Sequence, residues 1–169
     1  NYLNYDQNSS EFLAKGNIEI TQSDKQIEIE TESITFNKNQ NFISSTKKTI
    51  LKDKYKNIYD FDRFFYEMDK NLLKIQNVKI KDHKENEFFT EIAYLNTETN
   101  RLFGKDISIN LNNESFDENN EPRLKGNSVI NDNNTTEITK GVFTTCKKRD
   151  KCPPWQLSAK KIQHNKSKQ

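Results

Sequence analysis

The stretch ITFNKNQNF, residues 34–42, contains an apolar residue, an aromatic residue two positions later, a polar turn and a return to apolar residues. The same order recurs in FFYEMDKNL, residues 64–72, and in IAYLNTETNRL, residues 92–102. Residues two positions apart leave the same face of a strand, and the Asn-rich and Lys-rich gaps supply residues that tolerate turn conformations. Each stretch therefore predicts a β-hairpin, and their starts, about 30 residues apart, indicate stacked repeats.

The four glycines each stand just before a strand-like run, and they are Gly16, Gly104, Gly126 and Gly141. Glycine at the edge of a strand supplies a bulge, a corner or a positive φ angle at little steric cost. Asn77, in IQNVKI, occupies the same kind of position, and Asn is the next most tolerant residue. These positions are predicted to be corners between strands.

One segment also fits a helix. In residues 57–73, apolar side chains recur at the spacing of an amphipathic helix, at Ile58, Phe61, Phe65, Met68 and Leu72. The match of residues 64–72 to the two flanking repeats favours strands instead.

Two other segments alternate as strands do. In QIEIE, residues 26–30, and DISINL, residues 106–111, the isoleucines fall on one face. Many short strands with one apolar face need that face covered, and a regular repeat with corner residues favours a folded sheet of the jelly-roll or solenoid kind. The predicted fold class is therefore all-β.

The length of 169 residues suits one domain. The net charge of +2 does not indicate a nucleic-acid partner. The sequence has no nucleophile elbow, metal-ligand constellation or glycine-rich phosphate loop, so we expect no enzyme activity, no cofactor and no metal. No apolar run approaches the roughly 20 residues of a membrane-spanning helix, and the first residues do not resemble a signal peptide. We therefore expect either a cytosolic protein or a piece of a longer precursor.

The two cysteines, Cys146 and Cys152, flank a basic loop. A zinc site would need about four ligands, and His83 and His164 do not have finger-like spacing. A redox pair usually has the tighter Cys-x-x-Cys spacing beside a helix. A structural disulfide in an oxidising compartment fits better, formed either within this loop or with cysteines outside this chain.

A folded sheet whose two walls do not close fully would hold an apolar trough suited to acyl chains, and its end strands would offer unpaired backbone groups to a partner sheet. The alternative is that the interior closes on itself as an ordinary core. The candidate lining residues are the apolar side chains of the predicted strands: Ile18, Ile20, Ile27, Ile29, Ile34, Phe36, Tyr66, Ile92, Tyr94, Ile107, Ile109 and Val129.

The last 50 residues resemble a known family. The segments EPRLKGNSVINDNNTTEITKGVFTTC, residues 121–146, and CPPWQLSAKKI, residues 152–162, are similar to the periplasmic N-terminal domain of the lipopolysaccharide-assembly protein LptD, in its alphaproteobacterial form. The hairpins and corners of the first 120 residues resemble, more loosely, the OstA-type repeat that LptA, LptC and LptD share.

The resemblance implies a V-shaped β-jelly roll over residues 1–169, on the periplasmic side of the outer membrane of a Gram-negative bacterium. Such a domain accepts lipopolysaccharide from an LptA-like protein by edge-strand pairing. It passes the acyl chains along an apolar groove to an outer-membrane β-barrel, which an LptE-like lipoprotein plugs, and it catalyses no reaction. This chain of 169 residues does not contain that barrel.

The resemblance also implies that residues 142–169 form a membrane-proximal hairpin, in which Cys146 and Cys152 match the disulfide-forming cysteines of the family. Two other readings stay open. One is a free-standing periplasmic bridge like LptA or LptC, and the other is a closed structural β-solenoid that binds no lipid.

Overall fold

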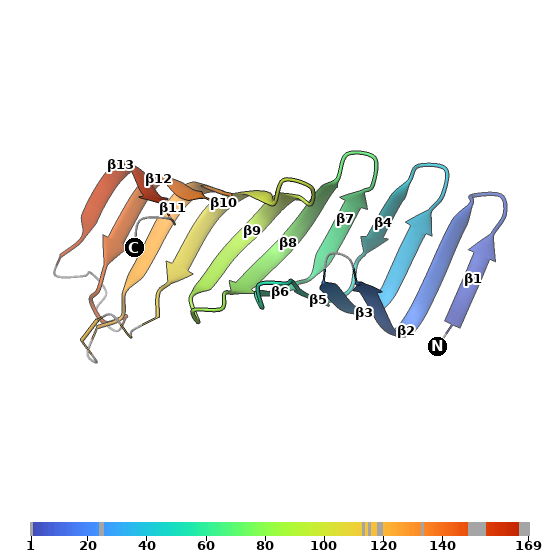
Figure 1. Cartoon of the computed structure of the whole chain (residues 1–169), viewed down its shortest axis with the longest axis horizontal. Coiled ribbons are helices and arrows are strands. Elements are labelled where there is room, and N and C mark those ends of the chain that lie inside the picture. Colours follow the sequence, from blue (N-terminus) through green and yellow to red (C-terminus); the bar gives the residue numbers. More distant parts are fainter. Residues whose placement is uncertain are drawn as a thin grey trace.

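The computed structural model describes residues 2–23, 26–112, 114, 116–117, 120–132, 134–148 and 155–165. These residues form one antiparallel sheet of 13 strands, with no α-helix among them. Figure 1 shows a long ribbon-like sheet with its strands side by side from the N-terminal to the C-terminal end. The predicted all-β fold class is confirmed.

The strands are β1 (Tyr2–Asp6), β2 (Glu11–Gln22), β3 (Ile27–Asn37), β4 (Phe42–Ser45), β5 (Thr49–Lys52), β6 (Ile58–Phe61), β7 (Arg63–Glu67), β8 (Leu72–Lys81), β9 (Glu87–Asn96), β10 (Arg101–Asn110), β11 (Arg123–Asn131), β12 (Thr135–Thr144) and β13 (Leu157–Asn165).

The sheet is folded along its length into two walls. Strand β3 pairs with β4 through residues 35–37 and with β5 through residues 28–31, and β8 pairs in the same way with β7 and β6. We call wall A the part that contains β1, β4 and β7, and wall B the part that contains β5 and β6. The other long strands run through both walls. The inner side chains of both walls pack into one apolar cluster, as in a jelly roll.

Pairing is interrupted where the long strands pass from one wall to the other. The register shifts between Lys15 and Ile18 in β2, and in β8 and β9 the pairs on either side of the bend are Gln76↔Ile92 and Val78↔Thr90. In Figure 1 the bend lies at the lower edge in β2 and at the upper edge in β13, so the folded sheet twists along its length.

The bends depend on residues with positive φ angles. Gly16 has φ 118° and Asn77 has φ 52°, as predicted for corners. In β10 and β12 the bends fall on Asp106 and Lys140, with φ 54° and 48°. Asp106 and Lys140 lack glycine's conformational freedom, so the strand pairing on either side of the bend holds them in the left-handed region of φ.

Gly104, Gly126 and Gly141 lie inside β10, β11 and β12 and have no positive φ angle, so that part of the prediction was wrong. Gly126 and Gly141 do lie at the bend, where the pairing of β11 with β12 is interrupted. They are glycines because of close packing. A Cβ atom at Gly126 would lie 2.3 Å from Ile138 Cγ2, and one at Gly141 would lie 2.4 Å from Ile162 Cδ1.

The three predicted hairpins are confirmed as β3–β4, β7–β8 and β9–β10. Their turns end on Asn41, Asn71 and Asn100, with φ angles of 49°, 50° and 56°. Asn and Asp tolerate this left-handed region better than other non-glycine residues. Residues 57–73 form β6, β7 and the start of β8, so the helical reading of that segment is wrong.

The opposite rim contains a second repeated turn that the sequence analysis missed. In DKYKN, residues 53–57, Asp53 Oδ1 accepts the backbone N–H groups of Tyr55 and Asn57 at 2.9 Å. In DHKEN, residues 82–86, Asp82 Oδ1 accepts those of Lys84 and Asn86 at the same distance. The recurring Asp-x-x-x-Asn spacing was the available signal, because an Asp side chain closes such turns on its own backbone.

The corner at Asn77 generates a prediction. Asn77→Gly is expected to leave the free energy of unfolding nearly unchanged, whereas Asn77→Ala is expected to lower it by about 1 kcal/mol, because Ala is strained at positive φ. Urea denaturation measures both. Both substitutions also remove the hydrogen bond that the Asn77 side chain donates to Asp62 Oδ2. Asp62→Ala measures the loss of that bond without changing the corner. Gln76→Ala is the control for an ordinary strand position. Equal stability of the Ala and Gly variants would refute the strained corner.

Candidate functional site

The inner face of wall A carries a row of apolar side chains that crosses eight strands, from β1 to β10. Each member is the direct cross-strand partner of the next, so all leave the same face. We call this the A row, and it consists of Tyr5, Phe12, Phe36, Ile43, Tyr66, Leu73, Leu95 and Leu102.

Wall B carries a longer row, from β2 to β13. We call this the B row, and it consists of Ile20, Ile29, Leu51, Tyr59, Ile80, Phe88, Ile109, Leu124, Phe143 and Leu157. Both rows run across the strands and therefore along the long axis of the folded sheet. Neither row contains a charged residue.

Burial divides the inner face into a closed centre and open ends. In the central strands Ile75 is 1% exposed and Ala93 is 0% exposed. At the N-terminal end Leu3 is 74% exposed, and at the C-terminal end Leu157 is 59% exposed. The apolar surface of the end strands thus has no second layer over it within the described residues.

The open N-terminal end is lined by stacked aromatic rings. The ring centroids of Tyr5 and Phe12 lie 4.2 Å apart with 24° between the ring planes, and those of Phe12 and Phe36 lie 6.2 Å apart at 22°. The three rings form a continuous apolar surface that reaches from β1 to β3.

Ten of the twelve predicted lining residues lie on the inner face. They are Ile18, Ile20, Ile27, Ile29, Ile34, Phe36, Tyr66, Ile107, Ile109 and Val129. Ile107, Ile109 and Val129 are buried in the core, and the others are half-buried.

Ile92 and Tyr94 lie on the outer face, because they alternate with Ala93 and Leu95 of the inner face. Their assignment to the lining was one residue out of register. In the third repeat Tyr94 lies six positions before the turn residue Asn100, whereas Phe36 and Tyr66 lie five positions before Asn41 and Asn71. The residue that takes their place on the inner face is therefore Leu95.

A small cluster of hydroxyl groups interrupts the apolar surface at the bend between β4 and β5. Thr31, Ser45 and Thr49 are buried, and the Thr49 hydroxyl lies within hydrogen-bond distance of both Thr31 Oγ1, at 3.1 Å, and the Lys47 carbonyl, at 3.0 Å. Because these hydroxyls bond to one another and to nearby carbonyls, their burial carries little penalty. We assign them a structural role at this bend.

Tyr59 is the polar member of the B row, and its hydroxyl donates to Asp53 Oδ2 at 3.2 Å on the rim. Burial raises the pKa of Tyr59 far above that of an ordinary tyrosine, and the negative charge of Asp53 raises it further. Tyr59 therefore presents a neutral ring to the interior throughout the physiological pH range.

Two hollows lie away from both rows. One, of about 330 Å³, is lined by Asn77, Lys79, Phe89, Glu91 and Asp106 among others, on the outer side of the bend. The other, of about 360 Å³, lies at the wall B rim beside Glu87, Asn110 and Lys148. The central inner face itself is closed by packing rather than hollow.

The cysteine segment connects β12 and β13, which pair as a hairpin. Cys146 is half-buried, and its backbone N–H donates to Thr144 Oγ1 at 3.2 Å, while Thr144 Oγ1 donates to the Trp155 carbonyl at 2.8 Å. The Trp155 ring meets Phe143 of the B row edge-on, with centroids 6.0 Å apart. Cys152 lies outside the described residues, and with it the predicted disulfide.

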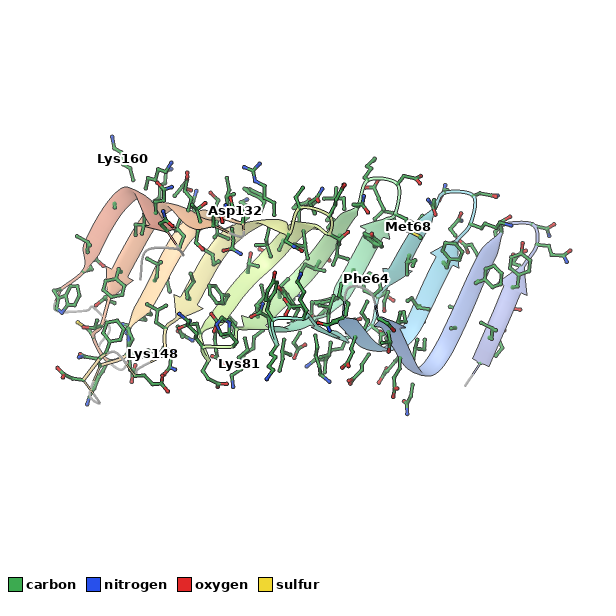
Figure 2. The ribbon with its side chains drawn as sticks, viewed as in Figure 1. Phe64, Met68, Lys81, Asp132, Lys148 and Lys160 are labelled. Atoms are coloured by element: carbon green, nitrogen blue, oxygen red, sulfur yellow. The ribbon has the colours of Figure 1, made fainter. Side chains whose placement is uncertain are left out.

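Charged side chains lie on the rims and the outer surface. Figure 2 shows Lys81 and Lys148 along one rim, and Lys160 projecting outward from the bend of β13. Within the described part of the chain, no group of three or more His, Cys, Asp or Glu side chains is arranged to hold a metal ion. The same residues include no helix that is long and apolar enough to span a membrane.

The chain matches no protein-family model and no curated protein. The fold alone defines the class: this is an all-β protein built on a folded sheet, whose apolar inner face is closed at its centre and exposed at its ends.

The rim position of Tyr59 generates a prediction. Its raised pKa means that Tyr59 stabilises the folded state below the ordinary tyrosine pKa of about 10, and that this contribution is lost as the pH rises further. Ultraviolet titration of the wild type and of Tyr59→Phe should therefore give the same tyrosinate signal up to that pH. A signal that is smaller by about half a tyrosine in Tyr59→Phe near pH 10, where an ordinary tyrosine is half ionised, would show that Tyr59 is not buried in this way.

Proposed function

We propose that this chain is a non-enzymatic module that binds the acyl chains of lipopolysaccharide along its inner face and conducts them. The observation that carries the proposal is the B row, an uncharged line of apolar side chains that continues from β2 to β13. The resemblance of residues 121–162 to the periplasmic domain of LptD supplies the identity of the lipid.

The physical requirement for such transport is continuous burial of the acyl chain. Each CH₂ group removed from water contributes about 0.8 kcal/mol, so a gap in the apolar path would be a barrier. A charged anchor within the path would hold the lipid at one point. The A row and the B row meet both conditions, since they are continuous and uncharged.

The closed centre defines how lipid would move. Acyl chains would first contact the open aromatic end, where Tyr5 is 42% exposed and Phe12 and Phe36 are half-buried. To pass Ile75 and Ala93, they would separate the two walls and replace wall-to-wall contacts with contacts to lipid. Because one apolar contact replaces another, the walls can part around a lipid at far lower free-energy cost than in water.

The two ends of the sheet suit different partners in this proposal. β1 pairs with β2 on one side only, and its other edge offers backbone groups to an LptA-like protein. β13 is the last strand at the other end, and the cysteine segment precedes it. In the LptD-like reading, that end lies towards the outer-membrane barrel and its LptE-like lipoprotein, on the periplasmic side of the outer membrane.

A closed structural β-solenoid is the competing function, and the burial of the central residues favours it. A bridge like LptA or LptC would use the same inner face but would lack the cysteine segment of residues 146–155. The first alternative predicts no contact between lipid and the inner face, and the second predicts the same contact with different partners.

Adjacent residues of β9 provide a matched test of lipid binding. Phe88 belongs to the B row, and Phe89 lies on the outer face beside Lys79. With the photo-crosslinking residue p-benzoylphenylalanine at Phe36 or Phe88, ultraviolet light should attach lipopolysaccharide to the purified chain. The same residue at Phe89 should give no adduct.

Mass spectrometry identifies the adducts, and circular dichroism confirms that each variant is folded. Adducts at Phe89 alone would place the lipid outside the folded sheet. If the folded protein gives no adduct at Phe36 or Phe88 when the lipid is well above its critical micelle concentration, the closed solenoid is favoured.

A further inference from the structure

The outer face of wall A carries a line of aromatic and basic side chains that acyl binding does not use. We call it the outer strip. It consists of Phe65, Lys74, Tyr94, Phe103 and Ile130, each the direct cross-strand partner of the next from β7 to β11. The strip runs across the strands, parallel to the A row on the opposite face.

The aromatic rings of the outer strip are open to solvent. Phe65 is 38% exposed and Phe103 is 43% exposed, although both lie within strands rather than at loop tips. Phe42 extends the surface, since its ring centroid lies 4.7 Å from that of Phe65. Contiguous exposed apolar surface of this kind marks an interaction site.

The strip is also basic. The Lys74 ammonium group lies over the Tyr94 ring, 5.8 Å from its centroid. Arg63 and Lys105 are members of the neighbouring row on one side, and Arg101 is a member of the row on the other. Three acidic residues lie in or beside these rows, and each has a cationic partner. Glu67 pairs with Lys70, Asp106 lies 4.0 Å from Lys105, and Glu137, the cross-strand partner of Ile130, pairs with Lys161.

From this arrangement we infer that the outer strip binds a linear anionic polysaccharide. A sugar ring has an apolar C–H face that stacks on an aromatic ring, and its carboxylate or sulfate groups pair with Lys and Arg. A single ligand thus matches both the rings and the charges.

The geometry favours a chain-like ligand. Neighbouring strands lie about 4.8 Å apart, so side chains two strands apart, such as Phe65 and Tyr94, lie about 10 Å apart. That separation suits alternate sugars of an extended chain laid across the strands, with Lys74 between them.

Other occupants fit less well. Neither of the two hollows is lined by a residue of the strip, so it does not resemble a small-molecule pocket. The rim beside it carries Asp69 and Glu98, whose charges oppose any anionic ligand that reaches the rim. A narrow chain on the strip avoids these two residues, whereas a flat anionic membrane would cover them too. In a symmetric dimer through this face, the cations of the two copies would lie against one another.

The experiment is affinity electrophoresis of the full chain in native gels that contain polygalacturonate, with dextran as the uncharged control. We expect the polygalacturonate gel to retard the wild type and the dextran gel to leave it unaffected. Removing both rings in Phe65→Ala/Phe103→Ala should weaken binding at least about tenfold. The matched control is Phe89→Ala, which removes a ring under Lys79 on the outer face of wall B and should bind like the wild type.

Circular dichroism verifies each fold. If the double variant does not fold, the exposed Lys105→Gln should still weaken binding severalfold, because it removes a charge beside the rings. Absence of retardation, or equal affinity of wild type and Phe65→Ala/Phe103→Ala, would overturn the inference. Binding only to anionic vesicles would instead assign the strip to a membrane. A wild-type dimer that is monomeric in the double variant would assign the strip to a second copy of the chain. The outcome does not depend on the inner face, so this proposal and the acyl-binding proposal succeed or fail separately.

Discussion

Every other feature of this molecule depends on the bend that divides its long strands into two walls. A flat sheet with one apolar face would leave that face in water, and this chain has no α-helix among its described residues to cover it. Bending the strands at positions such as Gly16, Asn77, Asp106 and Lys140 folds the sheet onto itself, so that one half of the apolar face covers the other. The strain at the non-glycine corners is offset by the burial that the bend makes possible.

Local patterns were sufficient to predict the strands and hairpins, because alternation along a strand and Asn at a turn are properties of neighbouring residues. Gly16 and Asn77 were predictable as corners for the same reason. Asp106 and Lys140 were not, since neither residue type signals a positive φ angle. The role of Gly126 depends on Ile138, a residue on the next strand, so no local pattern reveals it. Ile92 and Tyr94 were placed on the wrong face because the repeats were aligned on their aromatic residues, and the third repeat has one more residue between its aromatic residue and its turn Asn.

The inner face serves two purposes in the proposed function. Side chains that form the core in the absence of lipid would line its path when lipid is present, and the same apolar contacts would stabilise both states. In this proposal the open end, with the exposed Tyr5 ring and the half-buried rings of Phe12 and Phe36, would offer a first contact, and the packed centre would keep water out until a chain enters. The outer strip lies back to back with the A row, so two ligands of different chemistry would occupy opposite faces of one wall.

Separation of the two walls is the central claim, and a distance between their rims measures it most directly. Lys70, in the β7–β8 turn of wall A, and Lys54, in the β5–β6 turn of wall B, are exposed. Nitroxide labels at Lys54→Cys and Lys70→Cys, with Cys146 and Cys152 replaced by Ser, report this distance by double electron–electron resonance. If the walls part around acyl chains, the mean distance should lengthen when lipopolysaccharide is added. An unchanged distance distribution at saturating lipid would contradict it.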